Sequence, residues 1–293
     1  MRITNSMMSR NLLGNVNSSR SNMNDYQTQI ASGKKIEKVS DDPVNYTKID
    51  KFNNEISENN QYLDGIVLAK GWIDHTSTAL EQMNEGLLSA RDIAIRASDV
   101  SNNQTMYKAL KDQVDDIIED TISLSNSTFM GKSLFAGTKT TELKSFLLNN
   151  NSITYAGNNK AINRKISDNY YVDINVNGHE LVDTKTFENL ISLKNALDTG
   201  NLNNITESID KLDESSEQIT KLNSSIGSVK IQMINTENRL NTANLNLKSY
   251  LSNVGDTDMA EAIANYKSEE MAYRAALSAT SSTINLNILN FLR

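Results

Sequence analysis

One stretch of the sequence restricts the fold more than any other. Between residues 205 and 254 an apolar side chain returns at every seventh position: Ile205, Leu212, Ile219, Ile226, Met233, Leu240, Leu247 and Val254. A second, weaker stripe follows at Ile209, Leu222, Val229 and Leu251. A seven-residue period is typical of a helix that packs lengthwise against another helix. The stretch is therefore predicted to be one long helix with a helical partner.

The partner is expected in the first half of the chain, where the same period recurs at Phe52, Asn59, Ile66, Ile73, Leu80, Leu87 and Ala94. This pattern predicts a helix of about fifty residues, roughly 75–80 Å long. The segment "SDVSNNQ" ends it near residue 100, and a third helix is expected with a stripe at Met106, Leu110, Val114, Ile117, Thr121 and Leu124. Asn59, Asn223 and Asn244 interrupt the apolar stripes, where they either set the register or face solvent.

Both ends of the chain carry shorter amphipathic helices. The first has its stripe at Leu12, Val16, Ser19, Met23, Tyr26 and Ile30, and the last at Met259, Ile263, Tyr266, Glu270, Tyr273, Leu277, Thr280 and Ile284. Helix breakers separate both from the rest, and an exposed stripe of this kind is usually an interface between molecules. We expect an assembly interface at Leu12, Val16, Met23, Tyr26, Ile30, Met259, Ile263, Tyr266, Tyr273, Leu277 and Ile284.

The breaker after the first helix contains the only proline of the chain, in "SGKKIEKVSDDP". Gly33 is suited to the left-handed conformation that ends a helix. Asp42 is a good N-cap, and Pro43 suits the first helical position because its missing N–H would have had no partner there. Gly33, Asp41, Asp42 and Pro43 are therefore predicted to form a joint between two helices. At the other breaker, "NVGDTD", either Asp256 or Asp258 is expected to cap the last helix.

The middle of the chain has a different character. "FMGKSLFAGTKT" is expected to be a glycine-rich loop, while "SITYAGNN", "AINRKIS" and "NYYVDINVNGHELV" alternate apolar and polar residues around Asn-Gly turns. A short helix, "FENLISLKNALDTG", follows. The expected divisions are terminal coiled-coil helices over 1–32 and 257–293, a joint over 33–42, a helical rod domain over 43–139 and 186–256, and a small β domain over 140–185. The predicted fold is mainly α with a small β insert, an elongated antiparallel helical rod whose terminal helices form a coiled coil.

Composition and motifs argue against several classes of function. The chain has no cysteine, only two histidines that lack ligand-spaced partners, and 38% hydrophobic residues. It shows none of the common phosphate-binding, hydrolase or metal motifs. The net charge of -7 contains no basic block, so nucleic acid is not an expected partner. We expect no catalytic, cofactor-binding or metal site, no enzyme activity, no membrane contact and no cleaved signal peptide.

Several motifs, in their order along the chain, resemble the flagellin superfamily. They are "MRITNSMM", "QIASGKKIEKVSDDPVNY", "LFAGTKT", "ITYAGN" and the tail from "SNVGDTDMAEAIANYKSEEM" onward. "DDPV", where typical flagellins continue with Asp-Asp-Ala-Ala-Gly, is similar to the hook-filament junction branch of the superfamily, hook-associated protein 3. Leu134, Phe135, Ala136 and Gly137 match the central motif of that branch.

This resemblance implies a structural component of the extracellular bacterial flagellum that joins hook to filament. It implies export by the flagellar type III apparatus and terminal helices that order on assembly. The implied partners are copies of itself, the adjacent hook-associated junction protein, flagellin and an export chaperone. Two alternatives remain open: a short flagellin that forms the bulk filament, and a helical partner-binding or signalling rod.

Overall fold

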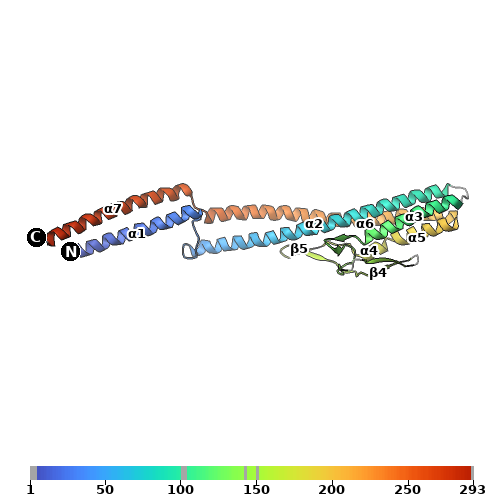
Figure 1. The fold of residues 1–293 in the computed structure, drawn as a ribbon, viewed down its shortest axis with the longest axis horizontal. Coiled ribbons are helices and arrows are strands. Elements are labelled where there is room, and N and C mark those ends of the chain that lie inside the picture. Colours follow the sequence, from blue (N-terminus) through green and yellow to red (C-terminus); the bar gives the residue numbers. More distant parts are fainter. Residues whose placement is uncertain (1–4, 100–103, 142–143, 150–151, 292–293) are drawn as a thin grey trace. The chain divides into compact units, whose positions relative to one another are not determined.

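The chain forms two compact units that share two long helices. The computed structural model describes residues 5–99, 104–141, 144–149 and 152–291, without the side chains of residues 5, 6, 9 and 283–291. One unit contains the residues up to Glu58 and those from Ala243 onward, and the other contains Asn59–Thr242. The long helices α2 (Pro43–Ser98) and α6 (Leu202–Gly255) contribute to both (Figure 1). The mainly helical character that the sequence predicts is confirmed.

The core of the second unit lies between α2 and α6. Every residue of the seven-residue repeat between positions 205 and 240 is buried, and so are the matching residues of α2 from position 66 to 94: Ile205, Leu212, Ile219, Ile226, Met233, Leu240, Ile66, Ile73, Leu80, Leu87 and Ala94. Burial of a large apolar side chain is worth about 1.5–3 kcal/mol. This shared stripe therefore stabilises helices that their polar surfaces alone would not hold.

Polar contacts flank the stripe and define its register. Lys70 pairs with Glu237 at 2.8 Å, and the Ser77 hydroxyl donates to the Asn223 amide oxygen at 2.6 Å. As the residue number increases along α2, the number of its partner on α6 decreases, so the two helices run antiparallel. Asn223 is one of the asparagines left open above, and it does bridge the two helices.

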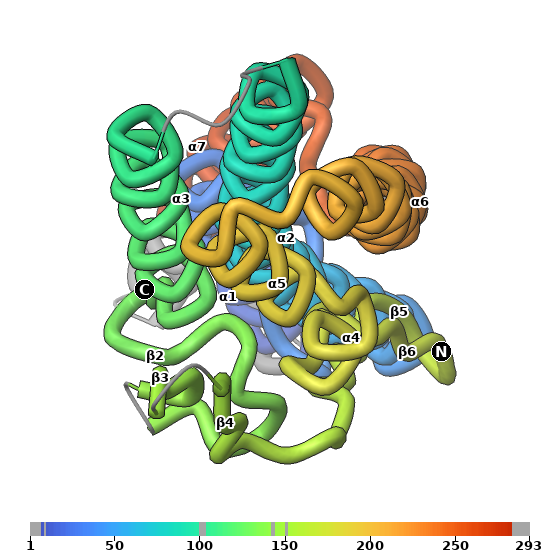
Figure 2. Tube along the Cα trace, turned by 90° about the vertical axis from the view of Figure 1, so that its right-hand side faces the viewer, coloured from blue at the N-terminus to red at the C-terminus, as the bar shows by residue number. Residues whose placement is uncertain are grey.

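Two further helices complete this unit. The helices α3 (Gln104–Ser125) and α5 (Thr186–Thr199) pack against each other beside α2 and α6 (Figure 2). The expected stripe of α3 is partly wrong, because Met106 is 43% exposed and Tyr107 is buried in its place. The buried set of α3 is Tyr107, Leu110, Val114, Ile118, Thr121 and Ser125. A 4-3 spacing counted from Leu110 fits Met106 and Tyr107 equally well, so the pattern alone does not decide which of the two is buried.

The β insert consists of three separate antiparallel hairpins. They are β1 (Thr128–Phe129) with β2 (Lys132–Ser133), β3 (Phe146–Asn149) with β4 (Ser152–Tyr155), and β5 (Asn163–Ser167) with β6 (Tyr170–Asp173). The first hairpin replaces part of the expected loop: Met130 and Gly131 both have positive φ at its tip. The expected Asn-Gly turn at Asn177 is wrong, because Asn177 caps the short helix α4 (Gly178–Asp183) and accepts hydrogen bonds from two backbone N–H groups.

The first unit is built around the terminal helices α1 (Asn5–Ser32) and α7 (Met259–Phe291). They pack against each other along their lengths and run antiparallel, with both described ends on the same side of the unit (Figure 1). The first turns of α2 and the last turns of α6 belong to the same unit. There the rings of Phe52 and Tyr250 lie 6.1 Å apart.

Candidate assembly interface

The seam between α1 and α7 follows a regular 4-3 spacing on both helices. The positions of α1 that turn inward are Leu12, Val16, Ser19, Met23, Tyr26 and Ile30, and those of α7 are Ala262, Tyr266, Glu269, Tyr273, Ala276 and Thr280. Asn22 Nδ2 donates to Glu269 Oε1 at 3.0 Å, which fixes the register. With this register Val16 lies level with Ala276, and Ile30 level with Ala262. At these two levels a larger residue of α1 faces an alanine of α7, whereas Tyr26 lies level with Tyr266.

The structure places the predicted residues of α7 on two different faces. Tyr266 and Tyr273 are half-buried at the seam, whereas Met259, Ile263 and Leu277 are 42%, 47% and 43% exposed. These three residues therefore lie outside the seam between α1 and α7, on a face that remains open to an assembly contact. Alanines take the inner positions because they let the two helix backbones approach, and a pattern that follows the largest apolar residues does not detect them. Ile284 lies in α7, but its side chain is outside the described residues.

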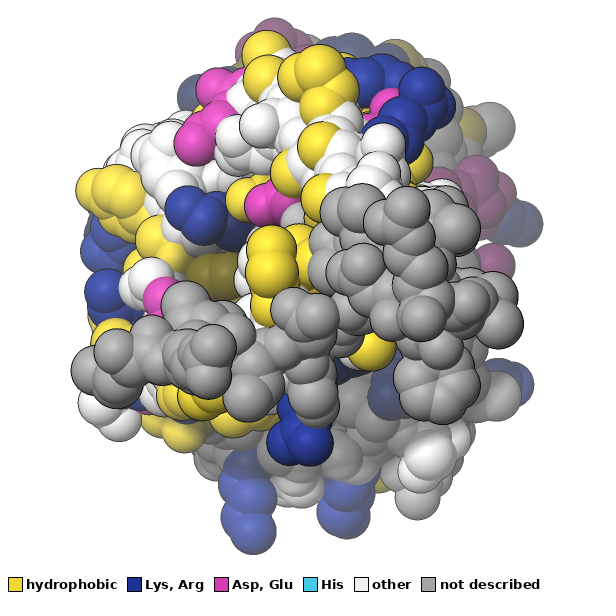
Figure 3. Space-filling model, turned by 90° about the vertical axis from the view of Figure 1, so that its left-hand side faces the viewer, with side chains coloured by type: hydrophobic (Ala, Val, Ile, Leu, Met, Phe, Trp, Pro, Cys, Tyr) yellow, Lys and Arg dark blue, Asp and Glu magenta, His cyan; other side chains and the backbone are white. Residues whose placement is uncertain are grey.

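Exposed apolar side chains accompany the outer face of this pair. On α1 they are Met7, Met8 and Leu13, and on α7 they are Met259, Ile263, Met271 and Leu277. Seen from the end where the described parts of both helices finish, hydrophobic side chains reach the surface among polar and charged ones (Figure 3). Repeated exposed apolar residues on neighbouring helices are typical of a surface that another protein covers.

Hydrogen bonds join the break between α1 and α2 to the break between α6 and α7. Gly33, at φ 70°, ends α1, and its carbonyl oxygen accepts a hydrogen bond from Thr257 N at 3.0 Å. Lys35 N donates to Gly255 O at 2.8 Å, so residues 33–35 and 255–257 form a short antiparallel ladder. Lys34 Nζ also pairs with Asp256, and this hydrogen bond lowers the pKa of the Asp256 carboxyl.

The two aspartates before Pro43 have separate tasks. Asp41 accepts hydrogen bonds from the N–H groups of Lys38 and Glu37, and these bonds lower its pKa. Asp42 accepts from Asn45 N at 3.0 Å and Val44 N at 3.1 Å, which lowers its pKa as well. Asp42 is therefore the N-cap of α2 and Pro43 its first residue, as the sequence predicts.

The second breaker is resolved in a similar way. Asp258 accepts from the N–H groups of Ala260 and Glu261, so it caps α7. Of the two aspartates proposed for this task, Asp256 is instead the partner of Lys34. In the first breaker, Ile36 is 8% exposed, and its burial holds the segment between Gly33 and Asp42 in place.

The central motif, residues 134–137, is buried against another segment of the β insert, the one that contains Asn158. Leu134, Phe135 and Ala136 are fully buried, and Gly137 has φ 64°. A Cβ at position 137 would collide with the carbonyl oxygen of Asn158. The amide of Asn158 in turn bonds Thr138, accepting from its backbone N–H at 3.0 Å and donating to its hydroxyl at 2.9 Å. The motifs "LFAGT" and "YAGN", far apart in the sequence, therefore form one structure.

Tyr155 closes this structure from the other side. Its hydroxyl lies 2.9 Å from the carbonyl oxygens of Phe135 and Asn158, and it accepts a hydrogen bond from Gly178 N at 3.2 Å. Burial raises the pKa of this hydroxyl. Sequence reasoning missed the parts of Asn158 and Gly178, because nothing local to either residue reveals a contact so distant along the chain.

The described residues contain no candidate metal site, and their two histidines lie far apart in the sequence. No cluster of three or more His, Asp or Glu side chains in this part of the chain has a metal-binding arrangement. The ring of His75 lies 4.9 Å from that of Phe129, and His179 Nδ1 lies 2.9 Å from Asp183. Among the helices as far as they are described, none combines the length and the apolar character that a membrane crossing needs.

Solved structures share this fold. A protein from Vibrio parahaemolyticus assigned as a flagellar hook-associated protein aligns with a TM-score of 0.69 and 18% identity, over 74% of this chain and 100% of that one. FlgL from Bacillus cereus aligns with a TM-score of 0.61 and 19% identity, over 69% and 99%. The flagellar junction protein FlgL from Legionella pneumophila aligns with a TM-score of 0.59 and 11% identity, over 73% and 100%. At these identities the likeness establishes the fold.

Sequence relatives and family models agree on the family. The flagellin of Bacillus subtilis is 25% identical over 320 residues, which span 100% of both chains. The bacterial flagellin N-terminal helical region matches residues 3–140, and the bacterial flagellin C-terminal helical region matches residues 209–292. Together the two matches extend over most of the chain and include both members of the terminal helix pair. This chain belongs to the flagellin family.

Proposed function

We propose that this protein is a structural component of the bacterial flagellum and acts as the adaptor between hook and filament. The observation that carries the proposal is the fold shared with the Legionella flagellar junction protein along the whole of that chain. The "DDPV" joint and the "LFAGT" motif support the same choice. The absence of a metal-binding arrangement in the described residues is compatible with a role that needs no chemistry.

The proposed role assigns a task to each part of the terminal unit. The α1–α7 pair presents Met259, Ile263 and Leu277 outward, where they would contact neighbouring subunits. Contacts of one surface with a different surface on the next copy produce a helical tube instead of a closed dimer. Gly33, Asp41, Asp42 and Pro43 would form the joint that sets how the terminal pair meets the rest of the subunit. The terminal coiled coil, the joint, the helical rod domain and the small β domain, with the boundaries given above, are part of this proposal.

Assembly would couple folding to binding. Inward residues such as Leu12, Met23, Tyr26 and Ile30 are only half-buried within one chain, so the isolated pair has a thin core. Covering the outer apolar residues would add the missing stabilisation, which favours ordering of the helices at the moment of assembly. Copies of itself, the adjacent hook-associated junction protein and flagellin are the proposed partners outside the cell. Inside it, an export chaperone would hold the terminal helices before passage through the flagellar type III apparatus.

A second candidate is a flagellin of the bulk filament. The observation in its favour is the match to the Bacillus subtilis flagellin over all of both chains. The terminal helices serve either role equally well, so the position of the protein along the flagellum separates the two.

Immunogold electron microscopy of intact cells, with an antibody against the β insert, tests the choice. Label confined to one short zone between hook and filament is the expected result. Label along the entire filament would contradict the adaptor role and identify a filament subunit. Surfaces without any label would contradict both, and would favour the helical partner-binding rod.

A further inference from the structure

The β insert carries an excess of exposed positive charge. Over the three hairpins, residues 128–173, the sequence has six basic residues and three acidic ones, Glu142, Asp168 and Asp173. Exposed members are Lys132, Lys139, Lys144, Lys160 and Arg164. Among the described residues no ion pair is recorded for any of these five, whereas the sixth, Lys165, pairs with Asp168 at 3.2 Å. The insert thus has a basic surface that its own unit leaves unneutralised.

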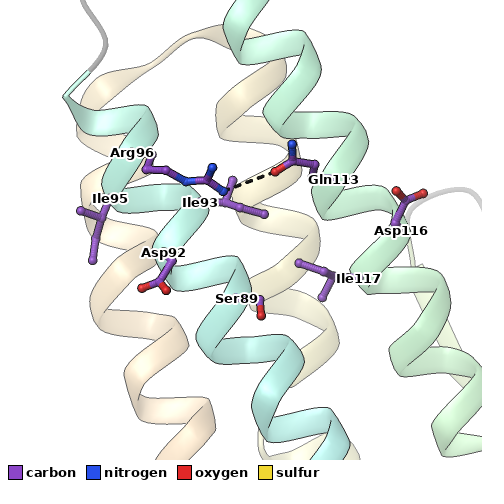
Figure 4. Close-up of a pocket in the computed structure, with 8 residues that line it drawn as sticks. All are labelled: Ser89, Asp92, Ile93, Ile95, Arg96, Gln113, Asp116 and Ile117. Carbon is purple, nitrogen blue, oxygen red and sulfur yellow. Dashed lines mark hydrogen bonds between the residues drawn. The ribbon is translucent and has the colours of Figure 1, made fainter.

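A groove of about 610 Å³ lies between α2 and α3 of the same unit. Its walls come from Ser89, Asp92, Ile93, Ile95 and Arg96 of α2 and from Gln113, Asp116 and Ile117 of α3. Figure 4 shows Ser89 and Ile117 directed into the space between the helices, and Arg96 bonded to Gln113 across it at 3.3 Å. The floor is thus apolar, and each wall contributes a carboxylate.

Acidic residues outnumber basic ones at the borders of this groove, whose lining also includes Arg96. Exposed carboxylates follow α3 at Asp112, Asp116, Glu119 and Asp120, and α2 at Glu85 and Asp92. Asp112, Asp116 and Asp120 are spaced four residues apart, so they are neighbours on one helix face and repel one another. Among the described residues no ion pair is recorded for these six. By contrast, Asp115, on the other side of α3, pairs with Lys194.

The groove and the basic insert lie on different sides of their unit. Seen end-on, α2 and α3 stand next to each other at the top, and strands β3 and β4 lie at the bottom, beyond α3 and α5 (Figure 2). Each surface has the charge that the other lacks, yet one chain cannot bring its own insert to its own groove.

We propose that the basic surface of the β insert of one copy docks into the acidic α2–α3 groove of the next copy. The occupant is a second copy of this chain because the same sequence supplies both complementary surfaces. Two unlike surfaces on different sides of a subunit form an open series of contacts. Opposite charges at such a contact select the partner and its orientation. The inference rests on the proposed function only in requiring that copies of this chain meet in a flagellar assembly.

Cross-linking of assembled flagella tests this contact. The chain lacks cysteine, so the double variant Ser89→Cys with Lys132→Cys reacts with a short bifunctional maleimide only at the groove and at the insert. Phe129, three residues before Lys132, packs on Trp72, which is seventeen helical residues from Ser89 or roughly 25 Å. A short spacer therefore favours links between chains over links within one chain, and dilution of the unassembled double variant provides the control for the latter.

The expected result is a ladder of dimers, trimers and larger species on a denaturing gel. Each single-cysteine variant should give no species beyond the dimer. The matched control, Ser89→Cys with Lys221→Cys on the exposed surface of α6, should give no ladder. Flagella that contain the double variant and show no ladder would overturn the proposal.

Charge reversal provides an independent arm. These variants are made in the chain that already carries both cysteines. Asp112→Lys with Asp116→Lys should lower the ladder yield by about tenfold or more, because like charges would then meet at the contact. Lys144→Glu with Lys160→Glu should lower the yield as much, for the same reason. Combining all four reversals in one chain should restore most of the yield. The control Glu214→Lys with Glu217→Lys changes the net charge equally on α6 and should leave the ladder unchanged. Failure of the four-fold variant to recover, with circular dichroism unchanged, would count against charge pairing at this contact.

The outcomes separate this contact from the adaptor role. A ladder together with gold label along the whole filament would retain the contact and reject the adaptor. Label at the junction with no ladder would retain the adaptor and reject the contact.

Discussion

One backbone conformation decides which residue can occupy position 137. Gly137 and Gly131 both have positive φ, but only Gly137 lies against another part of the chain, the carbonyl of Asn158. The two glycines therefore separate the cost of the conformation from the cost of the collision. We expect Gly131→Ala to lower the free energy of unfolding by about 1 kcal/mol. Gly137→Ala should lower it by about 3 kcal/mol or more, because the Asn158 carbonyl must also move.

Urea unfolding of both variants, followed by circular dichroism, provides the comparison. Similar losses for the two variants would mean that the close contact between the "LFAGT" and "YAGN" segments contributes nothing beyond backbone strain.

Acid should weaken the start of α2 through Asp42. Its pKa is lower in the folded chain than its ordinary value of 3.8, so the carboxylate stabilises the fold above that value, and the stabilisation is lost as the pH falls below it. Asp42→Asn retains a capping oxygen but removes the charge. It should therefore reduce the difference in urea midpoint between pH 3 and pH 7, while Asp42→Ala should lower the midpoint at pH 7 as well. An unchanged pH dependence in Asp42→Asn would assign the effect to other carboxyls.

At the scale of helices, the sequence predicts periodicity better than it predicts faces. The seven-residue repeats identify buried residues of α2 from position 66 to 94 and of α6 from position 205 to 240, because both helices need apolar side chains on the shared stripe. The same rule fails on α7, where Ala262 and Ala276 lie inside and Ile263 lies outside. Close approach of two helices selects small residues, and small residues leave little trace in a hydrophobic pattern.

The inner and outer faces of the terminal pair should respond differently to charge. Val16 is 8% exposed at the seam, whereas Leu13 on the same helix is 52% exposed. Val16→Lys should destabilise the helix pair by about 2 kcal/mol, because a charged group replaces a buried apolar one. Leu13→Lys should leave the monomer within about 0.5 kcal/mol of the unchanged chain. Thermal unfolding followed by circular dichroism measures both, and equal losses would contradict the assigned faces.

Assembly should depend on the outer face of α7. Ile263→Lys should leave the unfolding midpoint of the monomer nearly unchanged but remove the protein from purified flagella, because its side chain is 47% exposed and lies outside the α1–α7 seam. Tyr266→Lys, three residues further and at the seam, should lower both stability and incorporation. Normal incorporation of Ile263→Lys would show that this face is not an assembly surface.

At the scale of the molecule, the long helices and the breaks between them were predictable from the sequence, and the contacts inside the β insert were not. Helix breaks at Gly33 and Pro43 have local signals, which the sequence displays. The contacts of Tyr155 with Phe135 and Gly178 join segments about twenty residues apart on each side, and no local pattern encodes them. The same limit applies to the α2–α3 groove. In the sequence its acidic residues are typical of solvated helix faces, and only the packing of α2 beside α3 shows that they border a groove.

Amide hydrogen exchange should distinguish the two units. The second unit buries long runs of α2 and α6, whereas the described part of the terminal unit buries few side chains, Val16 and Ala262 among them. Backbone amides around Leu80, Leu87 and Ile219 should therefore exchange slowest, and those of α1 and α7 much faster. Mass spectrometry of peptic fragments would show the contrast, and uniform protection would contradict a division into units of unequal stability.

The ladder between residues 33–35 and 255–257 has a mechanical consequence. A single interrupted helix can swivel freely about its break, because rotation around a few backbone bonds meets little resistance. Here two interruptions lie next to each other and are joined by two backbone hydrogen bonds and the Lys34–Asp256 pair. Rotation of one break relative to the other would rupture these bonds, whereas bending about the line between them would not. We therefore expect this joint to bend about that line more easily than it twists.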